Sequence, residues 1–122
     1  MRQIAALCLA AATALAALPA VAAELVMVEQ KGCIYCERWD AEIAPGYPKT
    51  AEGRFAPLRR VDIGDVADDV ALQRRVIFTP TFLLVEEDAE LARIEGYPGA
   101  EFFWPLLDEM LREVTDYTGE SS

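Results

Sequence analysis

Two cysteines separated by two residues, Cys33 and Cys36, are the residues whose type and spacing point most directly to chemistry. They follow an apolar run at residues 25–28 and open a charged segment that is compatible with a helix. A helix that begins at the first cysteine places free N–H groups and the positive end of its dipole beside the sulfur, which stabilises a thiolate. Two intervening residues also put the sulfurs one turn apart, close enough to form a disulfide. The pattern predicts a dithiol redox site.

Three other roles compete for a cysteine pair of this kind. A structural zinc site usually needs four ligands, and the chain has no histidine and no second cysteine pair. A purely structural disulfide over so short a loop constrains little unfolded-state entropy and would be a weak staple. A copper(I)-binding module that uses only the two thiolates stays open, although methionine ligands are scarce and Met27 is expected to be buried in its strand. We prefer redox exchange and expect neither a metal nor a cofactor.

The first 23 residues have the pattern of a secretory signal peptide. A short basic start precedes an apolar segment at residues 4–18, and small residues end at Ala23, where cleavage is expected. The apolar run is shorter than the roughly 20 residues of a membrane-spanning helix. Cleavage would remove Cys8 and leave Cys33 and Cys36 as the only cysteines. A single pair of cysteines in an exported domain is better explained by a chemical role than by a need for structural disulfides.

The charge of the chain is strongly acidic, with 11 basic and 21 acidic residues and a formal net charge of −10. This excess argues against nucleic acid or an anionic membrane surface as a partner, and solubility is a sufficient explanation for it. Arg59 and Arg60 could form a basic patch for a substrate, but solvated side chains are the simpler expectation. Residues 24–117 are expected to form one domain, and residues 118–122 a flexible polar tail.

Apolar and charged segments alternate in a way that predicts the element order β-α-β-α-β-β-α. The first two strands should be parallel with a right-handed crossover, and the late hairpin should be antiparallel. The fold class is therefore α/β, a βαβ unit followed by a ββα unit. Strands are expected at residues 25–29 and 58–63, within 76–85 and at 91–95, and helices at 33–44, 65–75 and after 99, with a further helical turn at 48–54.

The second and last helices carry more detailed expectations. Asp65 should cap the second helix, and Arg74 and Arg75 should complement the dipole at its C-terminus. Pro105 should delay the start of the last helix or kink it near Trp104, because proline lacks an N–H. Apolar residues at helical spacing in the last helix are expected to form part of the core; they are Phe103, Leu106, Leu107, Met110, Leu111 and Val114.

A second motif, Thr79-Pro80-Thr81, stands directly before an apolar run at residues 82–85, as for a proline at the start of a strand. A C-x-x-C motif together with a distant Thr-Pro at a strand start resembles the thioredoxin family over nearly all of residues 25–114. The resemblance implies a thioredoxin-like fold with a central mixed sheet of about four strands flanked by helices. It also implies that Thr79-Pro80 is a cis-proline motif that sits against the dithiol.

The expected mechanism also gives roles to residues around the cysteines. The main chain of Thr79 could pair with a substrate strand, and Pro80 cannot donate a backbone N–H there. Tyr35 and Trp39 could shape the substrate groove, although a place in the core explains Trp39 equally well. The chain departs from thioredoxin in having Gly32 before the first cysteine and Ile34-Tyr35 between the two. Met27 also stands where thioredoxin buries an acid, which removes that route for proton transfer.

More narrowly, several segments resemble the SoxS group, periplasmic thioredoxin-like proteins of bacterial sulfur-oxidation (Sox) systems. This resemblance implies a periplasmic thiol–disulfide oxidoreductase that keeps the cysteine of a sulfur-carrier protein reduced. It also implies a membrane thiol transporter as the electron donor. The segments are residues 27–30, 33–36, 38–45, 47–50, 58–62 and 79–82.

The expected reaction is thiol–disulfide exchange, in which Cys33 attacks a substrate disulfide as a thiolate and Cys36 resolves the mixed disulfide. The direction depends on how strongly the thiolate is stabilised. Ile34-Tyr35 adds no donor that would stabilise it strongly, which favours a reductant. A disulfide-forming oxidant is the alternative.

Overall fold

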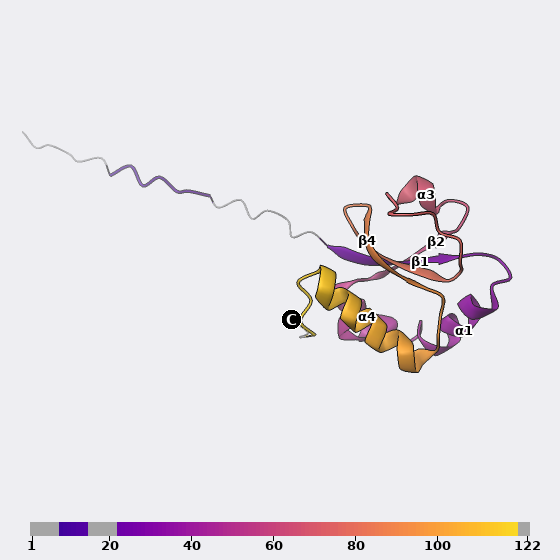
Figure 1. The fold of residues 1–122 in the computed structure, drawn as a ribbon. Coiled ribbons are helices and arrows are strands. Elements are labelled where there is room, and N and C mark those ends of the chain that lie inside the picture. Colours follow the sequence, from indigo (N-terminus) through magenta and orange to yellow (C-terminus); the bar gives the residue numbers. More distant parts are fainter. Residues whose placement is uncertain (1–7, 15–21, 120–122) are drawn as a thin grey trace, which may run out of the picture.

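The computed structural model of the protein describes residues 8–14 and 22–119 (Figure 1). Most of the expected signal peptide at residues 1–23, and residues 120–122 of the expected tail, lie outside the described residues. The first strand begins at Ala23, so cleavage after this residue would remove only the first residue of the strand. In the described part of the chain, no helix has the length and apolar character needed to span a membrane.

Four strands form one mixed sheet in the order β2-β1-β3-β4. The central strand β1 is parallel to β2 and antiparallel to β3, and β3 is antiparallel to β4. The sheet confirms the expected α/β class, with a parallel βαβ unit and an antiparallel hairpin. The strands are β1 (Ala23–Glu29), β2 (Leu58–Asp62), β3 (Thr81–Glu86) and β4 (Ala89–Glu95).

Helices cover both faces of this sheet (Figure 1). On one face, α1 and α4 pack with the short helices η1 and α2 over a core that includes Leu25, Met27 and Leu84. On the other face, α3 and the chain that follows it cover a smaller core that includes Val26 and Val28. The helices are α1 (Ile34–Glu42), η1 (Tyr47–Lys49), α2 (Ala51–Phe55), α3 (Val66–Asp69) and α4 (Ala100–Val114).

An aromatic cluster fixes α1 to the sheet. Trp39 is fully buried, and its ring centroid lies 5.2 Å from that of Phe82 on β3 and 5.9 Å from that of Phe103 on α4. Tyr47, also buried, lies 6.2 Å from Trp39 and donates a hydrogen bond of 2.6 Å to the carbonyl of Ala56. The segment after the cysteines is therefore held by large side chains whose burial contributes about 1.5–3 kcal/mol each.

The expected helix at residues 65–75 is wrong beyond Asp69. The Asp65 side chain makes no capping hydrogen bond, and α3 ends after one turn. The chain then pairs with the hairpin instead: the N–H of Ala71 donates to the carbonyl of Asp88, and the N–H of Glu90 donates to the carbonyl of Ala71. A helical continuation would leave these backbone partners unpaired, so the sheet edge determines the path of the chain. Arg74 and Arg75 consequently have no helix C-terminus to complement.

The last helix also differs from the expectation. It begins at Ala100, before Pro105, so this proline lies within the helix and does not delay its start. Because Pro105 has no N–H, the helix lacks one hydrogen bond, the one to the carbonyl of the exposed residue Glu101. The apolar stripe is narrower than expected, because Leu106 and Val114 are 41% and 38% exposed. Its buried residues are Phe103, Leu107, Met110 and Leu111.

A buried ion pair holds the irregular chain between α3 and β3 against β4. The guanidinium of Arg93 bonds both carboxylate oxygens of Glu90 at 2.6 and 2.7 Å, and the two side chains are 4% and 0% exposed. The same guanidinium donates to the carbonyl of Arg74 at 2.7 Å, and Glu90 accepts the N–H of Gln73 at 2.9 Å. These bonds fix the segment that leads to Thr79.

We predict that Arg93→Met destabilises the protein by about 3–5 kcal/mol, because it leaves the Glu90 carboxylate buried without its partner. Arg74→Met is the matched control: it removes an exposed ion pair with Glu95, 2.6 Å long, and should cost less than about 1 kcal/mol. Urea unfolding followed by circular dichroism measures both. Equal losses for the two variants would contradict the assignment of the buried pair as the anchor.

The pair also predicts a pH dependence. Burial by itself raises the pKa of Glu90, but hydrogen bonds from Arg93 and from the backbone of Gln73 outweigh burial and hold the pKa below its ordinary value of 4.5. A carboxylate with a lowered folded-state pKa stabilises the fold above the ordinary value, and this contribution is lost as the pH falls through the lowered one. The difference in stability between the wild type and Arg93→Met should therefore shrink on acidification below pH 4.5.

Candidate functional site

The two cysteines form a disulfide at the start of α1, with their Cα atoms 5.2 Å apart. Cys33 is the N-cap of the helix, and the N–H of Cys36 points at its sulfur across 3.1 Å. Cys33 is 9% exposed and Cys36 is 4% exposed, so the first cysteine is the more exposed residue of the two. An N–H donor and the positive end of the helix dipole thus both act on the sulfur that is expected to react.

Local sequence explains why the dithiol lies here. The strand β1 is buried from Leu25 to Val28 and ends at Glu29, where polar residues carry the chain out of the sheet. Gly32 has φ +77°, a left-handed conformation that glycine adopts without a steric penalty, and it directs the chain into the helix. Burial of Trp39 then sets the rotation of α1 about its axis, which places Cys36 on the inner side.

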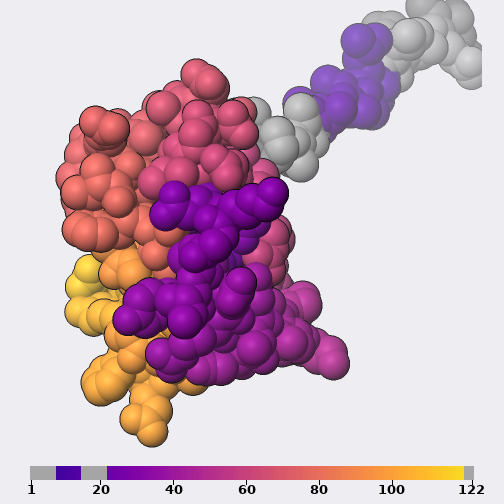
Figure 2. Space-filling model, turned by 90° about the vertical axis from the view of Figure 1, so that its right-hand side faces the viewer, coloured from indigo at the N-terminus to yellow at the C-terminus, as the bar shows by residue number. Residues whose placement is uncertain are grey.

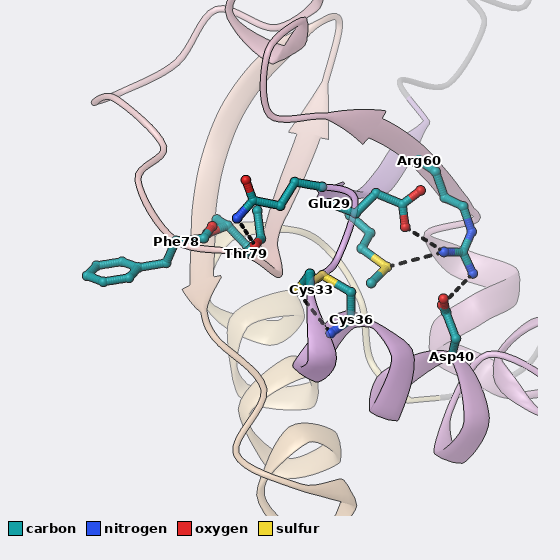
Figure 3. The surroundings of a disulfide bond; sticks show 10 residues. Glu29, Cys33, Cys36, Asp40, Arg60, Phe78 and Thr79 are labelled. Carbon is teal, nitrogen blue, oxygen red and sulfur yellow. Dashed lines mark hydrogen bonds and ion pairs between the residues drawn. A yellow bond between two sulfur atoms is a disulfide. The ribbon is translucent and has the colours of Figure 1, made fainter.

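The Thr-Pro motif lies against the dithiol. The peptide bond between Thr79 and Pro80 is cis, Pro80 is buried, and Thr79 is partly buried. The amide of Gln30 donates to the Thr79 hydroxyl at 2.9 Å, which joins the loop before the cysteines to the loop before β3 (Figure 3). Figure 2 looks onto this end of the molecule, where the loop and helix after β1, in purple, border the salmon segment at residues 70–90.

A largely apolar groove of about 570 Å³ runs beside the motif. Tyr35 and Thr79, two of the expected substrate-binding residues, both contribute to it, whereas Pro80 is buried and does not line it. Trp39 is completely buried and does not reach the groove. The groove is lined by Tyr35, Phe78, Thr79, Glu95, Gly96, Tyr97 and Pro98.

Exposed apolar side chains beside the C-x-x-C and Thr-Pro motifs were not identified from the sequence. Phe78 is 54% exposed although it immediately precedes the Thr-Pro motif, and Ile77 beside it is 63% exposed. Ile34, between the cysteines, is 65% exposed. The sequence predicts a strand within residues 76–85, which would include Ile77 and Phe78. In the structure β3 begins only at Thr81, so these two residues lie outside the sheet. Apolar side chains around a reactive pair are suited to contact a protein substrate.

Tyr97 forms one wall of the groove and is held by α1. Its hydroxyl donates to Glu42 at 3.0 Å, and the guanidinium of Arg38 lies 5.9 Å from its ring centroid. Desolvation, and next the hydrogen bond to Glu42, raise the pKa of Tyr97 to about 12. The phenol therefore stays neutral at physiological pH and joins α1 to the loop that precedes α4.

An acidic cleft of about 500 Å³ also borders the dithiol, and Figure 3 shows its residues Glu29 and Asp40 on the side away from Phe78. Arg60 bonds both of these carboxylates at 2.9 and 2.8 Å, and Arg59 bonds Glu24 at 2.8 Å. The two arginines are therefore partly exposed, as expected, but they also form ion pairs that were not expected. The cleft is lined by Glu29, Gln30, Lys31, Gly32, Cys33, Cys36, Glu37, Asp40 and Asp62.

Met27, which stands where thioredoxin has a buried acid, is itself fully buried, as expected. No group of three or more histidine, cysteine, aspartate or glutamate side chains that could hold a metal ion occurs within residues 8–14 and 22–119.

Comparisons with known proteins agree with this geometry. Residues 16–111 match the family model of a thioredoxin-like domain. Among solved structures, the chain is similar to the crystal structure of the periplasmic thioredoxin SoxS from Paracoccus pantotrophus in its reduced form. The two are 53% identical with a TM-score of 0.70, and the similarity covers 74% of this chain and 96% of that chain. No curated protein matches the chain in sequence.

We predict that Phe78→Ala raises KM for a peptide disulfide about tenfold, which corresponds to about 1.4 kcal/mol of lost apolar contact. The rate with hydroxyethyl disulfide, which is too small to fill the groove, should not change. Phe102→Ala is the matched control, because Phe102 is 62% exposed on α4 and does not line the groove. Steady-state kinetics with both substrates measures the effect, and an equal response of the two variants would refute the assigned role of the groove.

Proposed function

The chain belongs to the thioredoxin-like family and to its SoxS group, and we propose that it is a periplasmic reductase that keeps the cysteine of a sulfur-carrier protein reduced. Family membership and the Cys33–Cys36 pair make the protein a thiol–disulfide oxidoreductase. The observation that carries the proposal is the position of Cys33 as the N-cap of α1, with the N–H of Cys36 directed at its sulfur.

The proposed cycle starts from the reduced dithiol. The Cys33 thiolate attacks one sulfur of the substrate disulfide, forms a mixed disulfide and releases the other substrate sulfur as a thiolate, which takes a proton from solvent. Cys36 then loses its proton to solvent and attacks Cys33 of the mixed disulfide, which frees the second substrate thiol. The two electrons that reduce the substrate come from the two cysteines, which end as the Cys33–Cys36 disulfide seen in the structure.

The apolar groove supports a cysteine-bearing protein segment as the substrate. Phe78 and Tyr35 at its rim can contact an apolar side chain beside the reacting cysteine. Thr79 is partly buried at the groove, where its main chain can pair with an extended segment, and Pro80 offers no N–H that would compete. Main-chain pairing of this kind binds a segment with little dependence on its sequence.

The surroundings of the dithiol support a reductant. Among the described residues, the hydrogen bond to the Cys33 sulfur comes from the N–H of Cys36 alone. Ile34 and Tyr35 are 65% and 52% exposed, and neither side chain donates to the sulfur. A thiolate with modest stabilisation leaves the reduced form prone to give up its electrons, whereas strong oxidants have a stabilised reduced form.

The location and the electron supply complete the proposal. Residues 1–23 would direct export and be removed, and residues 24–117 would form the periplasmic domain. A membrane thiol transporter would return the Cys33–Cys36 disulfide to the dithiol by the same exchange chemistry. The similar SoxS structure is that of a periplasmic thioredoxin, which supports this location.

We predict that Cys36→Ser accumulates a stable mixed disulfide through Cys33, because the resolving thiol is absent. The probe is a peptide whose single cysteine is capped as a disulfide with 2-mercaptoethanol, and mass spectrometry detects the adduct. Cys33→Ser, the matched control, should form no adduct and should lower peptide release to the rate without protein. The wild type should release the free peptide thiol repeatedly when dithiothreitol is supplied.

The sulfur-carrier protein with its cysteine capped in the same way tests the substrate. We expect the wild type to uncap it with a higher kcat/KM than it shows for an unrelated capped peptide. Equal kcat/KM values would contradict the sulfur-carrier assignment, and full turnover by either cysteine variant would contradict the exchange mechanism itself.

A further inference from the structure

Arg60, Glu29 and Asp40 form an ion cluster next to the dithiol, here called the Arg60 cluster. The guanidinium bonds Glu29 at 2.9 Å and Asp40 at 2.8 Å, and the three side chains are 32–41% exposed. The cluster joins three elements, because Arg60 lies on β2, Glu29 on β1 and Asp40 on α1. Partial burial lowers the pKa of Arg60, but the hydrogen bonds and charges of Asp40 and Glu29 outweigh it and raise the pKa above its ordinary value. The arginine is therefore a permanent positive charge.

The position of the cluster relative to the sulfurs follows from the fold. Asp40 is four residues after Cys36 on α1, so the two side chains lie on one helix face with their Cβ atoms about 5–6 Å apart. The strand register places Arg60 opposite Met27, and its Nη1 lies 3.6 Å from the Met27 sulfur, which is buried in the same core as the cysteines. Figure 3 shows the three charged side chains together on one side of the disulfide.

The charges around the acidic cleft do not cancel. The cleft is lined by four carboxylates, those of Glu29, Glu37, Asp40 and Asp62, and by one lysine, Lys31. Arg60 adds one positive charge to this set through its bonds to two of the carboxylates. The net negative charge beside the two sulfurs therefore depends on Arg60.

Reduction of the disulfide takes up two electrons and two protons and yields two thiols, one of which, Cys33, can release its proton to solvent and become a thiolate. The oxidised pair carries no charge, whereas the reduced pair carries negative charge in proportion to its thiolate content. A positive neighbour therefore stabilises the reduced form, and a negative neighbour destabilises it.

We propose that the Arg60 cluster sets the redox equilibrium of the Cys33–Cys36 pair: Arg60 favours the dithiol, and Glu29 and Asp40 oppose it. In this role the three residues act through the sulfurs and do not contact the substrate. The net negative charge of the cleft then makes the dithiol a stronger reductant than it would be beside a cleft without net charge. This inference rests on the proposed reductase function, which it deepens by naming the residues that adjust the couple.

The test is the equilibrium between oxidised protein plus dithiothreitol and reduced protein plus cyclic dithiothreitol disulfide, measured by thiol labelling and mass spectrometry at pH 7. We expect Arg60→Met to lower the equilibrium constant for reduction about three- to tenfold, because Glu29 and Asp40 lose their counter-charge. A tenfold change corresponds to about 30 mV. Glu29→Gln and Asp40→Asn should each raise the constant, since they leave Arg60 less neutralised.

Arg60→Lys is the matched control, because lysine keeps the charge and loses the forked geometry. Its equilibrium constant should stay near that of the wild type, and about 1 M salt should bring the constants of all variants together by screening.

Equal shifts in Arg60→Lys and Arg60→Met, or no shift in any variant, would overturn the proposal. If circular dichroism shows that Arg60→Met does not fold, Glu29→Gln and Asp40→Asn test the proposal instead. A fall or no change in their equilibrium constants for reduction would contradict it. The differences between variants test the cluster, whereas the absolute potential of the wild type tests the reductase function.

Discussion

The burial of Trp39 is the constraint on which the arrangement of the site depends. This side chain packs between β3 and α4 and fixes where α1 lies and how it is rotated. Because α1 starts at Cys33, the same contact determines where the helix dipole meets the reactive sulfur. It also directs Cys36 inward and leaves Asp40, one turn later, facing Arg60, whose guanidinium lies 5.8 Å from the Trp39 ring centroid. One aromatic anchor thus positions both the redox pair and the charges beside it.

The dithiol lies between two surfaces of different character. One is the apolar groove lined by Tyr35 and Phe78, and the other is the acidic cleft lined by Glu29 and Asp40. Figure 3 shows Phe78 on one side of the disulfide and the two carboxylates on the other. The groove is suited to hold a substrate segment, since apolar contact is not directional and accepts many sequences. The cleft is suited to adjust the chemistry, since charge acts on the thiolate over several ångströms without contact. Binding and redox tuning can therefore vary separately in this fold.

Much of this architecture could be predicted from the sequence. The order of strands and helices and the site at the start of α1 follow from local signals, namely apolar runs, the C-x-x-C spacing and the Thr-Pro motif. The path of the chain after Asp69 could not be predicted, because residues around Ala71 follow the edge of β4 and not their own helical preference. The Arg60 cluster was missed for a similar reason. Its contacts depend on the register that puts Arg60 beside Met27 and on the rotation of α1, and no local pattern encodes either.

The reduction potential of the Cys33–Cys36 couple tests the central claim most directly. It can be measured in the wild-type domain by equilibration with dithiothreitol or glutathione at pH 7. A reductase whose thiolate receives one N–H and lies beside an excess of carboxylates should have a potential near that of thioredoxin, about −270 mV. A value near that of a strong disulfide-forming oxidant, about −120 mV, would contradict the account and reverse the direction of the proposed reaction.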